Sequence, residues 1–444
     1  GNLPAATPSS LYAKRQKRAD VQRGTRTVPT LFQLCVDFVV SNFEYVESLG
    51  DVDNDVRVAV SKELVRRNQL DAKAFDALVE PFMETLEIVD CAGIPHESMA
   101  NALAEMTALR YLLLTHAGRC FGPKSVQALL TTKTPLCCIS ISGAYILHDE
   151  DVSKLIEANA STLQSISFDT CPLLGEKFAS AIQNTENLLE LSLQNVTLPS
   201  SSLKFPKATF QNLQSLTLAW MPGLTDALLT ELLEASGSLE TLDVGHNYEL
   251  TDACLSGIRQ YGTKLRSLSL DGVKELTPAG LEAFFTHPLD GLPPPPKLKV
   301  LKLSSCDHQA ITDEVIALAT ASASIFSENS DKKTSPYELN VRSGGLAILN
   351  VNGSSLVSDA MLEKLVETSA NTLTDLNVSY CPLVTDQGLG YLVAKAGNQL
   401  AKVHVWGCAQ LTDEFFDGHR RVNDRSFEIV GAWMKKSGMR SLRQ

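Results

Sequence analysis

The amino-acid sequence predicts an α/β solenoid of about twelve turns, preceded by a small helical cap. Three observations lead to this prediction: apolar residues recur at a fixed spacing from residue 83 onward, a helix-start motif follows in many turns, and residues 30–80 depart from both patterns. In such a fold each turn supplies a short parallel strand on the concave face and a helix outside. One turn cannot bury its apolar face alone, so the stacked turns share one continuous core.

The repeat is clearest in residues 373–381, which read Leu-Thr-Asp-Leu-Asn-Val-Ser-Tyr-Cys. Apolar residues stand at relative positions 0, 3 and 5, and a small or apolar residue stands at position 8. The pattern opens at Met83, Leu109, Leu136, Leu163, Leu188, Leu213, Leu239, Leu265, Leu298, Leu346, Leu373 and Leu400. Two longer separations mark insertions near 290–297, which contains four consecutive prolines, and at 322–345, whose polar composition predicts a mobile loop.

A second motif, an aliphatic residue followed by Thr and Asp, precedes an amphipathic stretch in five turns. It occurs at 224–226, 250–252, 311–313, 384–386 and 411–413. Thr is a good N-terminal cap, and an acid in the first helical turn favours the positive end of the helix dipole. We therefore interpret these acids as structural and expect no catalytic or metal-binding row.

The cysteines also follow the repeat. Half of the ten occupy relative position 8, namely Cys91, Cys171, Cys306, Cys381 and Cys408. This arrangement resembles the cysteine-containing leucine-rich repeats of ubiquitin-ligase adaptors that carry an F-box. The resemblance implies a leucine-rich-repeat solenoid over 81–417, with these cysteines as buried thiols. No Cys-x-x-Cys pair is present, so we expect no metal site.

Charge is strongly segregated along the chain. Residues 1–29 carry six Lys or Arg against one acid, and residues 418–444 carry seven against two, whereas the part between them has 26 basic and 48 acidic residues. We expect a basic flexible tail at 1–29 and a basic cap or tail at 418–444. The acidic body should repel nucleic-acid phosphates and suit a protein ligand.

Relative positions 4 and 6 should line the concave face, where Lys302 is the one Lys against four acids. Among the residues at these positions, the aromatic ones are concentrated at His404 and Trp406. We regard Lys302, His404 and Trp406 as candidate partner-binding residues, since Trp is frequent at binding hot spots. Packing of Trp406 as a cap on the last turns is the alternative.

No candidate active site is present in the sequence. It lacks a Gly-rich phosphate loop and a nucleophile motif, and its eight His residues are scattered, so we predict no enzyme and no cofactor. No run of 18 apolar residues predicts a membrane span. The sequence starts at Gly1 without a signal-peptide pattern, and we expect an intracellular protein with further segments upstream.

The segment 30–80 begins with a predicted amphipathic helix capped by Thr30. Leu31, Leu34, Cys35 and Phe38 share one face of this helix. Further helices are expected at 56–67 and 72–85.

The first helix also matches, residue by residue, the box of elongin-C-binding proteins: Thr30, Leu31, Cys35 and Val39. The resemblance implies helix-in-groove docking, with Leu31 in a pocket of elongin C and Cys35 packed beneath it. The alternative is a cap that only buries the first repeat. Both are compatible, because a capping bundle can bury one face and offer another.

The wider N-terminal segment resembles the fungal leucine-rich-repeat family of global-genome nucleotide excision repair, the "Rad seven" family. The residues that carry this likeness are Leu31, Cys35, Asn42, Val46, Glu47, 49–52 and 61–64. The resemblance implies a nuclear protein that partners a Swi/Snf-type ATPase with a RING finger. It also implies membership of an elongin C and cullin ubiquitin ligase that acts on damaged chromatin.

Two other functions remain open at this point. One is a DNA-damage-binding factor that contacts DNA through its basic ends, which the acidic body disfavours. The other is an F-box adaptor for a Skp-type partner, although the N-terminal helices lack the Leu-Pro opening and the later Trp of an F-box.

Overall fold

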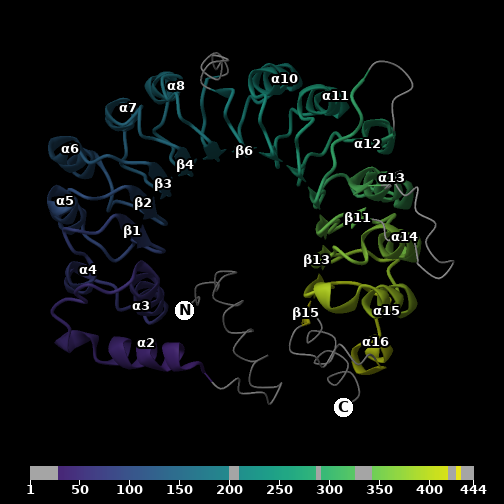
Figure 1. Cartoon of the computed structure of the whole chain (residues 1–444), viewed down its shortest axis with the longest axis horizontal. Coiled ribbons are helices and arrows are strands. Elements are labelled where there is room, and N and C mark those ends of the chain that lie inside the picture. Colours follow the sequence, from purple (N-terminus) through teal and green to yellow (C-terminus); the bar gives the residue numbers. More distant parts are fainter. Residues whose placement is uncertain (1–28, 200–209, 287–291, 326–342, 419–426, 432–444) are drawn as a thin grey trace, which may run out of the picture.

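The computed structural model describes residues 29–199, 210–286, 292–325, 343–418 and 427–431. They form an arc with the strands on its inner side and the helices on its outer side (Figure 1). Neighbouring strands of the main sheet are parallel, and each turn pairs with the next along the chain. This is the predicted leucine-rich-repeat architecture.

The main sheet has thirteen strands within the described residues. They are β1 Thr85–Ile88, β2 Tyr111–Leu114, β3 Cys138–Ser142, β4 Ser165–Asp169, β5 Glu190–Gln194, β6 Ser215–Ala219, β7 Thr241–Asp243, β8 Ser267–Ser269, β9 Val300–Lys302, β12 Ile348–Asn350, β13 Asp375–Asn377, β14 Lys402–His404 and β15 Glu428–Val430. The first twelve begin two residues after the predicted repeat openings.

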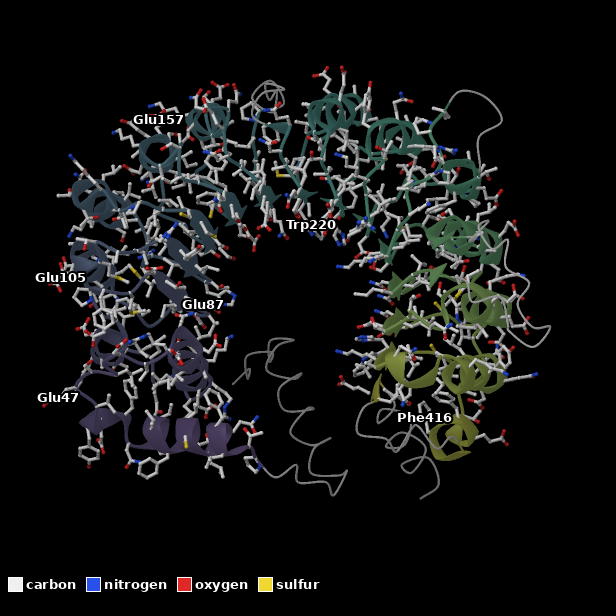
Figure 2. The ribbon with its side chains drawn as sticks, in the orientation of Figure 1. Glu47, Glu87, Glu105, Glu157, Trp220 and Phe416 are labelled. Carbon is white, nitrogen blue, oxygen red and sulfur yellow. The ribbon has the colours of Figure 1, made fainter. Side chains whose placement is uncertain are left out.

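Helices cover the outer side of the arc. They are α5 His96–Glu105, α6 Pro123–Thr132, α7 Asp149–Ala158, α8 Glu176–Ile182, α10 Asp226–Ala235, α11 Asp252–Tyr261, α12 Pro278–Phe285, α13 Asp313–Ala323, α14 Asp359–Ser369, α15 Asp386–Lys395 and α16 Asp413–Gly418, with a short 3-10 turn η3 Gly397–Gln399. Figure 2 shows Glu105 and Glu157 on the outer side of the arc, whereas Glu87 lies toward the hollow.

Burial alternates along each strand as the repeat pattern requires. In β4, Ile166 and Phe168 are buried while Ser165, Ser167 and Asp169 are half-buried on the concave side. The buried positions of neighbouring strands pair in register from turn to turn, as Leu86 does with Leu112. The stacked aliphatic residues form one continuous core, so a single turn does not have to be stable by itself.

The strands of the second to the twelfth turn end at a left-handed corner. The residue at relative position 7 has positive φ in every turn from the second to the twelfth. Glycine fills this position in four turns, and Asn195 (φ 49) and Trp220 (φ 55) are examples of the others. A residue with a Cβ costs roughly 1–2 kcal/mol in this conformation, and the surrounding sheet offsets that cost.

The Thr-Asp motif joins successive turns. In all five motifs the Thr hydroxyl accepts a helix N-terminal N–H, as predicted. In four of the motifs the Asp has a further role, because its carboxylate accepts from the capping residue of the next turn. Asp359, which follows Ser358 instead of Thr, does the same: it accepts the backbone N–H of Thr385 at 2.9 Å and its hydroxyl at 2.5 Å.

The helical cap precedes β1. It comprises α2 Leu31–Ser41, a 3-10 turn η1 Phe43–Tyr45, α3 Asn54–Arg66 and α4 Ala72–Leu78. Leu64, Phe75 and Leu78 are buried and extend the repeat core into the cap. The predicted third helix was placed at 72–85, but α4 ends at Leu78 because the chain must straighten to form β1.

The C-terminal boundary differs from the sequence prediction. The sheet continues past residue 417, since β15 pairs with β14 through Lys402 and Glu428. Phe427 and Ile429 are buried there. The pattern missed this turn because it opens without the usual Leu at relative position 0.

The second insertion departs and returns at one place. Two short antiparallel strands, β10 Ser324–Ile325 and β11 Ser343–Gly344, close its base. The mobile loop predicted over 322–345 otherwise lies outside the described residues, as do the tail at 1–28 and most of 418–444. At the first insertion, Arg259 donates to the carbonyl of Pro293 at 3.0 Å.

Candidate functional site

Helix α2 presents an apolar face to solvent. Leu31 is 77% exposed and Phe38 is 72% exposed, and Leu34 and Cys35 are also exposed. At helical spacing these four residues share one side, as the sequence predicted. We call them the exposed α2 face. Because water-facing apolar side chains of this size gain nothing from folding, this face is a candidate docking surface.

The opposite side of α2 packs against the cap. Val36 and Val40 are buried, and Val39 is partly buried against the core. Val39, the last residue of the predicted box, thus lies at the edge of the exposed α2 face and contributes to both sides. The helix therefore buries one side as a cap and exposes the other, so the capping and docking interpretations are compatible.

Thr30 fixes the start of α2. Its hydroxyl accepts the backbone N–H of Gln33 at 3.2 Å, and the Gln33 side chain accepts the backbone N–H of Thr30 at 2.9 Å. This reciprocal capping box confirms Thr30 as the predicted cap. It satisfies two of the donors that a helix start leaves unpaired, so Leu31 stands on an ordered first turn.

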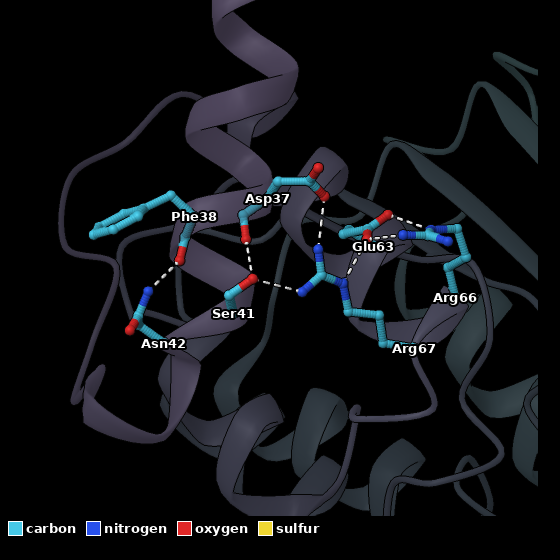
Figure 3. A network of polar contacts seen from close by, with 7 residues as sticks. All are labelled: Asp37, Phe38, Ser41, Asn42, Glu63, Arg66 and Arg67. Atoms are coloured by element: carbon cyan, nitrogen blue, oxygen red, sulfur yellow. Dashed lines mark hydrogen bonds and ion pairs between the residues drawn. The ribbon is translucent and has the colours of Figure 1, made fainter. Parts of the chain in front are cut away.

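A polar network fastens α2 onto α3 (Figure 3). The Arg67 guanidinium donates to the Asp37 carboxylate at 2.6 Å, to the Ser41 hydroxyl at 2.8 Å and to the Glu63 carboxylate at 2.6 Å. Hydrogen bonds from Arg66 first, and from Arg67, hold the pKa of Glu63 down to about 2. The charge of Glu63 is thus retained at neutral pH, and Arg67 fixes the position of α2 through both helices.

A buried arginine forms hydrogen bonds with backbone carbonyls of the cap. Arg57 of α3 donates to the carbonyls of Leu78 and Gly50, each at 2.5 Å. Burial lowers the pKa of Arg57, although Glu80 and Asp51 favour its charged form. These bonds tie the turn after η1 to the end of α4.

Three further rings of the cap and the segment before β1 are exposed and were not singled out from the sequence. They are Phe32, Tyr45 and Phe82. Tyr45 follows the turn after α2, and Phe82 precedes β1. Neither belongs to a periodic pattern, so only the structure shows that they are exposed.

The predicted concave residues do not form one site. Lys302 lies in β9 and His404 in β14, with β12 and β13 between them. Burial lowers the pKa of His404, although Asp375 at 3.7 Å favours its charged form. The structure therefore brings together His404 and Asp375, but it separates Lys302 from them.

Trp406 follows β14 and lies against the last turn. Its backbone N–H donates to the Ser379 hydroxyl at 3.2 Å. A Cβ at Gly431 would stand 2.9 Å from the Trp406 nitrogen, so the chain after β15 passes close by. This packing supports the capping alternative for Trp406.

A second aromatic cluster lies in the middle of the arc, at relative positions 7 and 9 rather than 4 and 6. Trp220 and His246 stack with ring centroids 4.2 Å apart at 11°, and Tyr248 stands edge-on to Trp220 at 6.0 Å. Trp220 lies at the inner side of the arc (Figure 2). The missed signal was relative position 7, which holds an aromatic residue in two consecutive turns.

The described part of the chain has neither a metal-binding cluster nor a membrane-spanning helix. No group of three or more His, Cys, Asp or Glu residues there is arranged to hold a metal ion. None of its helices is long and apolar enough to cross a membrane. The Lys and Arg residues of both predicted basic ends fall outside that part, so contact with DNA stays a prediction.

Comparison with known proteins agrees with this fold. The family model described as Leucine Rich repeat matches residues 369–393. The DNA repair protein rhp7 of Schizosaccharomyces pombe is 23% identical over 255 residues, which cover 56% of this chain and 45% of rhp7. The chain thus spans about half the length of the curated relative that it matches.

Among solved structures, the crystal structure of the Rad7 and Elc1 complex in yeast contains a similar chain. The TM-score is 0.67 at 16% identity, over 97% of this chain and 100% of that one. The structural likeness shows the leucine-rich-repeat fold along nearly the whole chain. Together these findings confirm the resemblance to the leucine-rich-repeat DNA repair family that the sequence predicted.

Proposed function

We propose that this chain, a relative of leucine-rich-repeat DNA repair proteins, is a non-catalytic adaptor of nucleotide excision repair that recruits elongin C through α2. One observation carries the proposal: Leu31, Leu34, Cys35 and Phe38 are exposed together on a capped helix whose opposite side is buried. The similar yeast chain is in complex with Elc1, an elongin C, which supports the choice of partner.

Docking would follow the helix-in-groove mode. Leu31 enters an apolar pocket of elongin C, Phe38 covers the next turn of the groove, and Cys35 packs between them as a small apolar group. Burial of a fully exposed Leu or Phe side chain contributes about 1.5–3 kcal/mol. The two most exposed residues of the face therefore supply most of the affinity.

The Arg67 network lowers the cost of binding. Because Arg67 bridges Asp37, Ser41 and Glu63, α2 is held in one orientation on α3 before the partner arrives. A preformed helix does not have to be ordered on binding, which favours affinity. Asn42 also ends the helix, since its side-chain amide donates to the carbonyl of Phe38 at 2.8 Å.

The solenoid would serve as the second arm of the adaptor. Its long concave surface, with Lys302 and His404 as candidate contacts, suits a folded protein or an extended segment. By analogy with the repair family, we infer that this arm holds a Swi/Snf-type ATPase with a RING finger or a ubiquitylation target. A cullin would complete the ligase, and the site of action would be nuclear.

Co-purification of this chain with elongin C tests the proposal, with a Skp-type protein beside it. We expect a stable complex with elongin C, and we expect Leu31→Asp with Cys35→Asp to abolish it without unfolding the repeats. Leu383→Asp is the matched control, since Leu383 is an exposed leucine far along the solenoid. The proposal would be refuted if the complex persisted in the double variant, or if the chain bound the Skp-type protein alone.

A further inference from the structure

The middle of the arc carries exposed rings on the edge where the strands end. Trp220 and His246 occupy the left-handed corners after β6 and β7, and their rings stack in parallel. Trp220 is 44% exposed and Tyr248 is 58% exposed. Trp and Tyr are the residues most often found at the centres of protein interfaces, because each combines a large apolar body with a polar tip.

A glycine in the next turn makes this stack possible. Gly272 occupies the equivalent corner after β8 with φ +70, and a Cβ there would lie 2.1 Å from the His246 Nδ1 atom. The imidazole therefore occupies the space between the indole and the Gly272 backbone. Trp220 is held in a fixed orientation by its neighbours while much of its ring stays in solvent.

Two aspartates lie close to Gly245, the residue before His246: a Cβ there would stand 3.1 Å from Asp243 Oδ1 and 3.6 Å from the Asp271 Cβ. The backbone N–H of Trp220 donates to the carbonyl of Gly245 at 3.1 Å, and the N–H of Gly245 donates to the Asp243 carboxylate at 2.9 Å. In the next turn, the N–H of His246 donates to the Asp271 carbonyl at 2.6 Å. Asp243 thus belongs to the same turn as His246, and Asp271 belongs to the turn that follows.

These carboxylates lie in an electrostatically unfavourable position. Burial raises the pKa of Asp271, and the negative charge of Asp243 raises it further, while hydrogen bonds from Ser304 and the charge of Lys302 lower it. The Asp271 carboxylate accepts the backbone N–H of Ser304 at 2.6 Å and so is fixed in place. Lys302 on the neighbouring strand offsets only part of this charge, and an added cation would offset more.

We propose that Trp220, His246, Tyr248, Asp243 and Asp271 form a binding site for a basic, extended segment of a partner protein. A Lys or Arg side chain of that segment would lie over the indole or phenol ring, with its charge directed to the two carboxylates. Cation–π contact and carboxylate pairing favour the same residue types. The 48 acids against 26 basic residues between residues 30 and 417 add long-range attraction for such a segment.

A nucleic acid fits the same site poorly. Bases stack on Trp and Tyr, but the phosphates beside them would face Asp243 and Asp271. The site also lies on elements other than α2. Its occupancy is therefore independent of elongin C recruitment, and failure of one inference leaves the other intact.

Peptide binding to the full chain tests the inference. The probe is a fluorescently labelled 12-residue peptide of alternating Arg and Ala, compared with one of alternating Glu and Ala, followed by anisotropy. Trp220→Asn removes the ring and keeps the backbone, because Asn195 holds the equivalent left-handed corner one turn earlier. Tyr248→Ser, outside that corner, is a second variant, and melting curves check that both fold.

Charge is tested by Asp243→Asn with Asp271→Asn. The matched control is Glu231→Gln with Glu234→Gln, which removes two exposed charges from α10 on the outer side of the arc. We expect Trp220→Asn and the Asp pair each to weaken binding of the basic peptide about tenfold. The control pair should weaken it less than about twofold.

Three results would overturn the inference. Equal losses in the two charge pairs would mean that the peptide senses only net charge. Unchanged binding in Trp220→Asn and Tyr248→Ser would remove the aromatic rings from the site. Binding of a 12-nucleotide oligothymidylate that depends on Trp220 would assign the site to nucleic acid instead.

Discussion

Two glycines of α15 should respond to alanine in opposite directions. Gly388 is buried at the third position of the helix, and a Cβ there would lie 2.2 Å from the Asp359 carboxylate carbon. Gly390, two residues later, has nothing within 4 Å of the same point. Gly388→Ala must therefore displace the carboxylate that joins α14 to α15, whereas Gly390→Ala only changes helix propensity.

The magnitudes follow from the bonds involved. Displacement of Asp359 breaks its bonds with the Thr385 N–H at 2.9 Å and the Thr385 hydroxyl at 2.5 Å. Such charge-assisted bonds contribute roughly 1.5–3 kcal/mol each when buried, and about half of that at this partly exposed place. Alanine returns about 1 kcal/mol of helix propensity. Gly388→Ala should thus destabilise the α14–α15 junction by about 0.5–2 kcal/mol, and Gly390→Ala should stabilise α15 by up to about 1 kcal/mol.

Amide hydrogen exchange is the suitable assay, because long repeat arrays need not unfold in one step. Protection of α15 should fall about tenfold in Gly388→Ala and should rise in Gly390→Ala. In an Asp359→Ala background the carboxylate is gone but the Cβ, 2.6 Å from the same point, remains, so Gly388→Ala should cost less than it does with Asp359 present. If Gly388→Ala is neutral or stabilising with Asp359 present, the role assigned to this carboxylate is refuted.

Three further predictions concern the cap and the thiols. Arg67→Met should weaken elongin C binding several-fold and increase hydrogen exchange in α2. Arg66→Met is the control and should have less effect on both, because Arg66 bonds only to Glu63. Equal effects of the two substitutions would contradict the role of Arg67. The pKa of Glu63 is depressed to about 2 from an ordinary 4.5, so its contribution to stability is fully present above pH 4.5 and is lost as the pH falls toward 2. The protection factors of the α2 amides, corrected for the intrinsic exchange rate at each pH, should fall over that window, and Glu63→Gln should reduce this dependence. Iodoacetamide at pH 8 should alkylate exposed Cys35 before Cys171 and Cys381, because burial raises the pKa of Cys171 to about 11 and that of Cys381 to about 12. Bound elongin C should protect Cys35 from alkylation. Mass spectrometry that finds the buried thiols modified first would contradict the assignment of Cys35 as the exposed thiol.

The repeats were predictable because their spacing records burial directly. Apolar positions 3 and 5 are the inward residues of each strand, so twelve strands could be placed from the sequence alone. The exposed α2 face was predictable for a related reason: Leu31, Leu34, Cys35 and Phe38 recur at helical spacing. Periodicity alone did not show that Val36 and Val40, on the other side of the helix, were the buried ones.

Features that depend on contacts between turns were not predictable in the same way. Asp359 lies outside the five Thr-Asp motifs, and its bonds to Thr385, a residue 26 positions away, depend on how two turns stack. The Trp220 stack likewise needs an empty corner at Gly272, 52 positions along the chain. β15 was missed because its turn keeps the buried Phe427 and Ile429 without the opening Leu.

The short ribbon formed by β10 and β11 has a practical consequence for protein engineering. Ser324 pairs with Gly344, so the insertion leaves and rejoins the solenoid at adjacent points. Val300 of β9 and Ile348 of β12 stay in register as if no residues had been added. Extra length at such a junction costs only about 0.6 kcal/mol for each doubling. This junction is therefore a suitable graft point for a fluorescent reporter or an affinity tag, which would leave both α2 and the concave surface unobstructed.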